Sequence, residues 1–549
     1  MPKRKYLVSI VLGLLLAGCA AQSPAGYSTH KRPPQRPFIV PDSINALFNR
    51  QETARLIRGA TFGPIPGDIG YVGRIGAAEY LDSQFNPYSI RDSLCRSILA
   101  DLPVLTMTPK ELYENYPPPF VLRRKYGKDY KINPKESTRE IIVELEAADL
   151  IRDVYSDRQI QALMTEFWMN HFNIYALKPL VPYYLVDFTN RIRRNALGNF
   201  SDLLKSVATS PAMLIYLDNA VSAAPDFAAR KRGDLFRLRR ELGPFAGRNA
   251  YLDRLGTGFF KSKGLNENYG RELLELHTVG LHYTQRDVIA AARCLTGWTV
   301  KPIMDGGGFL YDPFMHDEGE KSVLGLTIPP GGGFNDGMEL LDYIANSPLT
   351  AHHISRELCE FFISDNPPAK LVDRIANVFM ASHGNIRRVL LAIFLSNDFR
   401  DGDYHKFKNP YEYIVSAIRG ADASFYPSKQ LFGFIRSMGL VPYLVNSPKG
   451  YSELSKSWID PDIILEHANF AMALANNRIK HIDVNYGEMF ANGVAATPGE
   501  LEDDFAREVL GSPLDAKTRD AVDREASRAH ARMGEIYALL LDSPQFQMR

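Results

Sequence analysis

Residues 137–172 read STREIIVELEAADLIRDVYSDRQIQALMTEFWMNHF. Apolar residues recur every three or four positions along this stretch, which is the spacing of one face of an α-helix. Ser137 with Glu140 has the pattern of a capping box, and Ser156 with Gln159 repeats it at the start of a second apolar run. The stretch therefore predicts two consecutive amphipathic helices.

The same start signals recur along the rest of the chain. Thr284 with Asp287, the pair Ser347-Pro348, and Asn385 each precede a run of helical periodicity. Alternating β-branched runs are scarce, and glycine triplets mark residues 304–337 as a long mobile loop. The predicted fold class is mainly α, a large multi-helix globular body with glycine-rich loop insertions and few short strands.

Composition excludes several classes of protein. Of 549 residues, 45% are hydrophobic and 23% charged, as in soluble globular proteins rather than disordered or polytopic membrane proteins. Lys and Arg total 64 against 63 Asp and Glu, so net charge gives no reason to expect a nucleic acid partner. The chain also lacks H-E-x-x-H, G-x-S-x-G, C-x-x-C and G-x-G-x-x-G, which counts against the familiar zinc proteases, α/β-hydrolases and dinucleotide enzymes.

The first residues have the pattern of an export signal. Lys3, Arg4 and Lys5 precede an apolar run from residue 7 to 18, too short for a spanning helix of about 20 residues. The run ends in Leu-Ala-Gly-Cys at 16–19, which resembles the lipobox of bacterial lipoproteins. That resemblance implies cleavage before Cys19, acylation of Cys19, and attachment to the outer membrane through the lipid. The alternative is an ordinary secretory signal with a chance cysteine.

These signals divide the chain into three parts. The expected parts are a lipoprotein signal peptide at 1–18, a proline-rich tether at 19–43 and a helical body at 44–549. Within the body we expect sub-lobes at roughly 44–220, 264–425 and 426–549, with an arginine-rich insertion at 221–263. The composition of that insertion is typical either of a solvated segment or of a surface patch that binds anionic glycans or lipid headgroups.

Two histidines on apolar helix faces are the first candidates for chemistry. His171 lies among Phe167 and Trp168 with Glu166 on the flank, and His277 lies among leucines of a helix expected at 267–278. A buried histidine is either a satisfied core residue or a ligand or base with a lowered pKa. The candidate catalytic residues are Glu166, His171, Glu267, Arg271, Glu272, Glu275 and His277.

A metal site is a second hypothesis. No helix supplies a Glu-x-x-His pair, so a divalent metal would have to be bound between helices. The candidate ligands are His171, His277, His316 and Asp317, the last two from the glycine-rich stretch. The cofactor itself is unknown.

Seven motif blocks together resemble one large bacterial family. They are ARLIRGATFGPIPGDI (54–69), ALGNFSDLLKSVATSPAMLIYLDNA (196–220), NENYGRELLELHTVG (266–280), DVIAAARCLTGW (287–298), HDEGEKSVLG (316–325), KNPYEYIVSAIR (408–419) and GYSELSKSWIDP (450–461). The family is domain of unknown function 1800. The resemblance implies a largely helical, exported protein, and a co-encoded exported sulfatase-like protein as a partner, but no activity.

Two hypotheses about function follow. The first is an envelope lipoprotein that is a hydrolase with a buried histidine–carboxylate site, with or without a metal. The second is a non-enzymatic helical scaffold or partner-binding lipoprotein, in which the same polar groups only connect helices. The two differ in whether the candidate residues converge on one cavity.

Overall fold

The computed structural model describes residues 37–227, 264–400, 406–487, 497–528 and 532–549. Residues 38–549 form one compact unit. Cys19, the signal peptide, residues 19–36 of the predicted tether and residues 228–263 of the arginine-rich insertion lie outside the described residues. The last residues of the predicted tether, 37–43, are described and belong to the body, where Val40 is buried.

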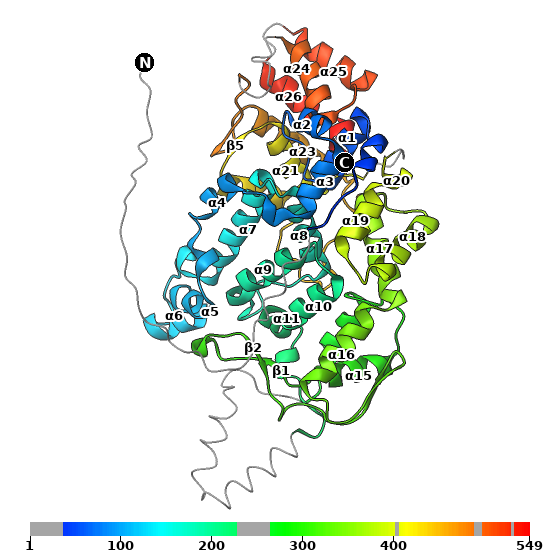
Figure 1. The fold of residues 1–549 in the computed structure, drawn as a ribbon. Helices are drawn as coiled ribbons and strands as arrows, with labels where there is room; N and C mark the ends of the chain where they lie inside the picture. The colour runs from blue at the N-terminus through cyan, green and yellow to red at the C-terminus, as the bar shows by residue number, and fades with distance from the viewer. Residues whose placement is uncertain (1–36, 228–263, 401–405, 488–496, 529–531) are drawn as a thin grey trace, which may run out of the picture. The chain divides into compact units, whose positions relative to one another are not determined.

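Helices dominate the described chain, which confirms the predicted fold class (Figure 1). The first group is α1 (Arg50–Ala60), α2 (Asp68–Ile75), α3 (Ala77–Phe85), α4 (Ser93–Leu99), α5 (Pro109–Asn115), α6 (Pro119–Tyr126), α7 (Thr138–Tyr155), α8 (Gln159–His171), α9 (Leu185–Asn195), α10 (Phe200–Ala208) and α11 (Pro211–Tyr216). The second group is α14 (Asn268–Glu275), α15 (Gln285–Cys294), α16 (Phe334–Ala345), α17 (Pro348–Phe362), α18 (Ala369–Ala381), α19 (Ile386–Phe394) and α20 (Asn397–Arg400). The last group is α21 (Pro410–Gly420), α22 (Lys429–Ser437), α23 (Pro461–Ala475), α24 (Pro498–Phe505), α25 (Ala516–Ala526), α26 (Met533–Leu541) and α27 (Pro544–Gln547).

Most of the predicted helix starts are confirmed, but their caps differ in detail. Thr284 and Asp287 form the expected capping box, and Ser347 and Asn385 cap α17 and α19. At α7, Ser137 accepts from the backbone N–H of Arg139 rather than forming the predicted box. The helix expected at 267–278 ends at Glu275, so His277 lies in the turn that follows α14.

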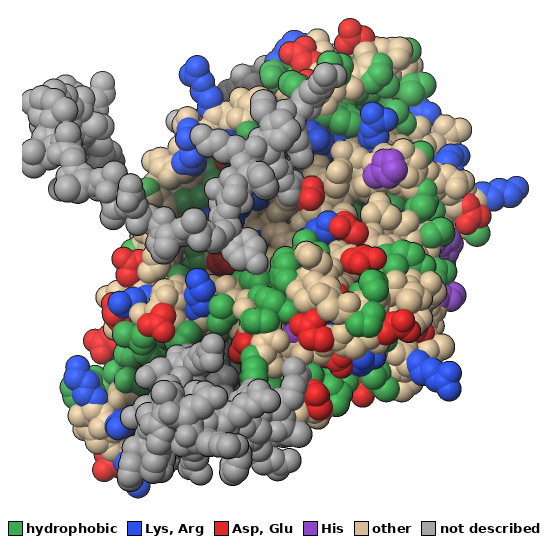
Figure 2. Space-filling view, turned by 60° about the horizontal axis from the view of Figure 1, so that its bottom comes forward, with side chains coloured by type: hydrophobic (Ala, Val, Ile, Leu, Met, Phe, Trp, Pro, Cys, Tyr) green, Lys and Arg blue, Asp and Glu red, His purple; other side chains and the backbone are tan. Residues whose placement is uncertain are grey.

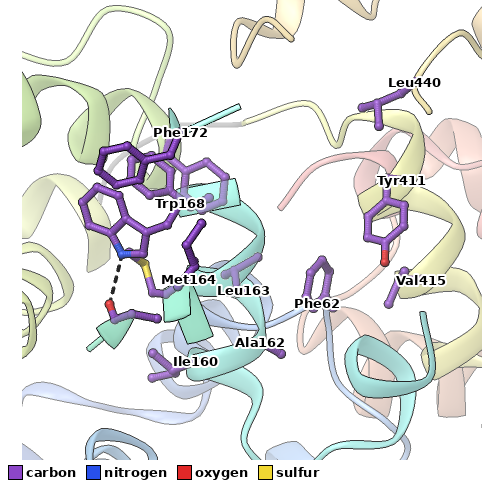
Figure 3. Packing of buried hydrophobic residues seen from close by; sticks show 14 of the residues in the cluster. Phe62, Ile160, Ala162, Leu163, Met164, Trp168, Phe172, Tyr411, Val415 and Leu440 are labelled. Carbon is purple, nitrogen blue, oxygen red and sulfur yellow. Dashed lines mark hydrogen bonds between the residues drawn. The ribbon is translucent and has the colours of Figure 1, made fainter. Parts of the chain in front are cut away.

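Helix α8 lies in the middle of the hydrophobic core. Its apolar side carries Leu163, Met164 and Trp168, all buried, and the indole N–H of Trp168 donates to the carbonyl of Ala196 at 3.0 Å (Figure 3). Tyr411 of α21 lies across from α8 in the same view. Residues 137–172 therefore form α7 and α8, and α8 packs its apolar side into the hydrophobic core.

The glycine-rich stretch is folded and is not the long loop that the sequence suggested. Strand β1 (Trp298–Val300) pairs antiparallel with β2 (Phe309–Tyr311), and β3 (Lys321–Val323) pairs with β4 (Leu326–Ile328). A third pair joins β5 (Ser424–Phe425) and β6 (Ile482–Asp483). Val323 and Ile328 are buried, so the second hairpin is fixed by core packing, and Leu324 and Gly325, both at positive φ, make its turn.

Among the described residues, no helix combines the length and the apolar character needed to cross a bilayer. Acidic and basic side chains are interspersed over the face shown in Figure 2.

Candidate functional site

A cavity of about 250 Å³ lies beside the polar flank of α8. Its walls come from α4, α7, α8, α9 and α21, and from the segment that contains residues 440–451. The acidic and basic residues that line it are Asp92, Arg96, Asp149, Arg152, Asp153, Arg158, Glu166 and Arg193. We call this space the α8 cavity.

Glu166 is the sequence-predicted catalytic residue that lines the α8 cavity. Its Oε2 is buried and has no hydrogen-bond partner within the part of the chain that the structure describes. Burial, followed by the negative charge of Glu453, raises the pKa of Glu166 well above its usual range. These surroundings favour the protonated form of the carboxyl group more than the surroundings of an exposed glutamate would.

Asp153 of α7 is the second buried carboxyl group on the cavity wall. Its Oδ2 accepts a hydrogen bond from the hydroxyl of Tyr411 at 2.6 Å. Burial, followed by the charge of Asp149, raises the pKa of Asp153 well above its usual range. The hydrogen bond from Tyr411 favours the ionised form of Asp153, and Oε2 of Glu166 has no such donor among the described residues.

Asp149, one turn before Asp153, has the opposite environment. Its Oδ1 lies 3.1 Å from a guanidinium nitrogen of Arg152 and 3.3 Å from one of Arg193, and its Oδ2 accepts from the hydroxyl of Tyr443. Burial lowers the pKa of Arg193 to about 10, which still leaves it cationic at neutral pH. Asp149 therefore links α7 to Arg193 of α9 and to Tyr443 on the cavity wall.

Asn170 of α8, and Asn173 just after the end of α8, bind the segment that closes the cavity. The amide of Asn170 donates to Glu453 Oε1 at 2.6 Å, and that of Asn173 donates to the carbonyls of Val445 and Ser447. Gly450 has φ of +73°, and a Cβ atom there would lie 2.6 Å from the backbone oxygen of Asn170. Only glycine allows this close approach, which fixes Glu453 behind Glu166.

The two predicted histidines do meet, but in the aromatic core rather than in the cavity. The rings of His171 and His277 are 6.1 Å apart, and the ring of Phe172 lies 4.4 Å from that of His171. Nδ1 of His171 donates to Glu357 Oε2 at 2.8 Å, and Glu357 Oε1 lies 3.4 Å from Nε2 of His353. Burial, followed by the charges of His171 and His353, lowers the pKa of His277 well below its usual range.

The other predicted metal ligands lie in different surroundings. His316 is fully buried, with Nδ1 2.8 Å from the carbonyl of Thr296 and Nε2 3.1 Å from Asp336 Oδ2. Asp317 forms an ion pair with Arg293 at 2.8 Å. Within the described ranges, no group of three or more His, Cys, Asp or Glu side chains is arranged to hold a metal ion. The four predicted ligands are thus not brought together.

The predicted acidic helix also faces away from the α8 cavity. Glu267 lies 3.9 Å from Arg271 and accepts from the amide of Gln285, all on the surface, and Glu275 accepts from the hydroxyl of Tyr283. Burial raises the pKa of Glu272, which does not line the cavity either. Glu267 with Arg271 and Gln285, and Glu275 with Tyr283, form polar contacts around α14 and α15.

Comparison with known families agrees with this fold. Residues 55–548 match the family described as a protein of unknown function, DUF1800. The chain belongs to the DUF1800 family. No curated protein and no solved structure matches this DUF1800 chain.

Proposed function

We propose that this DUF1800 protein is a hydrolase of the cell envelope, with its active site in the α8 cavity. The observation that carries the proposal is the carboxyl group of Glu166, which lies buried on a cavity wall and has no partner at Oε2 among the described residues. Burial raises its pKa well above the usual range. A carboxylic acid kept neutral at neutral pH serves as a general acid. The export signal and the lipobox-like Cys19 support the envelope location.

The proposed roles divide between the two carboxyl groups. Glu166 donates its proton to the leaving group, while ionised Asp153 accepts a proton from the attacking water, as in hydrolases that use paired carboxylates. The raised pKa of Asp153 makes its carboxylate a stronger base than an exposed aspartate. Asp149 with its two arginines, and the hydroxyls of Tyr411 and Tyr443, orient the substrate and these acids.

The substrate need not be known to test this proposal. An isolated envelope preparation is incubated with the full chain in water labelled with heavy oxygen, and soluble products are analysed by mass spectrometry. A hydrolase transfers solvent oxygen to its product whichever bond it cleaves. Labelled products are expected from the wild type, and none from Glu166→Gln or Asp153→Asn.

Glu146→Gln is the matched control. Like Glu166, Glu146 of α7 is a buried glutamate, and burial raises its pKa to about 7. It does not line the α8 cavity but a small neighbouring cavity beside Arg436, which shares Tyr411 and Pro442 with it. This variant should release labelled products like the wild type. Absence of labelled products from the wild type, or equal release by Glu166→Gln, would favour the scaffold hypothesis instead.

A further inference from the structure

A second hollow, which shares no lining residue with the α8 cavity, lies between α1, α20 and the C-terminal α27. Its volume is about 670 Å³. Three arginines face it: Arg55 and Arg58, one turn apart on α1, and Arg400 at the end of α20. Leu510, Gly511, Ser512, Pro544, Gln545 and Met548 form the opposite wall. We call it the arginine groove.

The three guanidinium groups have unequal surroundings. Arg400 is well satisfied, because it donates to the carbonyl of Leu47 and to Asn397 Oδ1 at 2.9 Å each and lies 3.4 Å from Glu52 Oε1. Arg55 has one bond, from Nη1 to the carbonyl of Arg400 at 2.6 Å. Nε of Arg58 is buried, and it has no partner in the described ranges.

Charge in the groove is also unbalanced. Glu52 is the one carboxylate among the lining residues, and its other oxygen already accepts from the backbone N–H of Asn49 at 2.6 Å. Burial and the neighbouring charge of Arg55 lower the pKa of Arg58 to about 10, so Arg58 remains cationic at neutral pH. A buried cation without a counter-charge is unfavourable, and an anion bound in the groove would remove that cost.

We infer that the arginine groove binds the phosphate group of an anionic ligand. Arginine presents planar pairs of donors that match the oxygens of a phosphate, and Arg55 and Arg58 can approach one such group from the same helix face. The groove is larger than a phosphate ion, so the natural ligand carries the phosphate on a larger body. That body is either a soluble phosphomonoester or a lipid headgroup.

The first experiment titrates inorganic phosphate into the full chain in a non-ionic detergent and measures heat. The wild type is expected to bind one phosphate with an affinity that falls as salt increases. Arg58→Gln and Arg55→Gln should each weaken binding roughly tenfold or more, because each removes charged hydrogen bonds. Arg388→Gln, which changes an exposed arginine of α19, should bind like the wild type.

A second arm separates the two sources of phosphate. The Cys19→Ser chain, which lacks the site of the expected anchor, is mixed with vesicles of phosphatidylcholine with or without phosphatidate. Flotation with the phosphatidate vesicles alone, lost in Arg58→Gln, indicates a lipid headgroup; phosphate binding without flotation indicates a soluble ligand.

The proposal is overturned if the wild type binds neither probe, or if Arg55→Gln and Arg58→Gln bind phosphate as tightly as Arg388→Gln. Asp401 and Asp403 follow Arg400 in the sequence and lie outside the described residues. If these two aspartates neutralise the groove, the wild type will not bind phosphate, whereas the double variant Asp401→Asn/Asp403→Asn will bind it. That result also contradicts a ligand site in the native chain. If Arg58→Gln fails to fold, phosphate binding by Arg55→Gln tests the proposal, because Arg55 is only half-buried.

Discussion

Three carboxyl groups on the wall of the α8 cavity, two from α7 and one from α8, have different neighbours. Asp149 lies between two guanidinium groups, whereas Asp153 and Glu166 lie in the buried wall with few donors. The sequence predicted Glu166 because it lies on the flank of an apolar helix. It did not predict Asp149 and Asp153, whose signal was two acids four residues apart within the apolar run of α7.

Another buried residue, His467 of α23, makes acid stability testable. Its ring stacks on Tyr413 with centroids 3.9 Å apart, and burial lowers its pKa to about 4. In the unfolded chain the ring takes up a proton near pH 6.5, so the folded state loses stability as pH falls from about 6.5 to about 4.

The full loss from this one residue is about 3 kcal/mol, at roughly 1.4 kcal/mol per unit of pKa. His467→Gln should therefore lose less stability between pH 7 and pH 5 than the wild type, as measured by urea unfolding. Equal losses would mean that the folded ring accepts a proton as readily as the unfolded one.

The two histidines show what helical periodicity can and cannot predict. Periodicity predicted apolar surroundings for His171 and His277, and the structure brings the two rings together, although His277 lies in the turn after α14. Periodicity cannot show whether an apolar face meets a cavity or other side chains. Here Trp168, Phe172 and Tyr269 fill the space around the rings.

At the scale of elements, α14 and α15 lie so close together that one added methyl group should destabilise the protein. A Cβ atom on Gly270 would lie 2.8 Å from the carbonyl oxygen of Val288 and 2.9 Å from the backbone nitrogen of Ala292. Gly270→Ala should destabilise the protein by about 1–3 kcal/mol, because the two backbones must separate.

Gly433, within α22, provides the comparison. It is exposed, and a Cβ atom there would have no neighbour within 4 Å. Gly433→Ala should stabilise the protein by about 0.5–1 kcal/mol through helix propensity. Chemical denaturation of both variants tests the packing, and a neutral Gly270→Ala would show that α14 and α15 lie farther apart.

Elements with local start signals could be predicted from the sequence, and those without them could not. Caps at Thr284, Ser347 and Asn385 involve residues within three positions of one another, so local pattern suffices. The hairpins of residues 298–328 depend on burial of short strands against distant helices, such as β3 against α15. Glycine content alone therefore suggested a loop.

At the scale of the whole molecule, the lipobox-like residues 16–19 predict attachment to a membrane through an acylated Cys19. Cys19→Ser should move the protein from the membrane fraction to the soluble periplasmic fraction and abolish acyl labelling. A variant that still fractionates with membranes would exclude the lipoprotein hypothesis.

The central claim is that Glu166 holds a proton at neutral pH in the wall of the α8 cavity. Infrared spectroscopy measures this directly, because the carbonyl stretch of a protonated carboxyl group is separate from the bands of ionised carboxylates. The difference between the wild-type spectrum and that of Glu166→Gln at pH 7 should contain this band. The difference between the wild-type spectrum and that of Glu339→Gln, which changes an exposed glutamate, should not contain it. A difference spectrum at pH 7 that shows only ionised carboxylate for Glu166 would contradict the account.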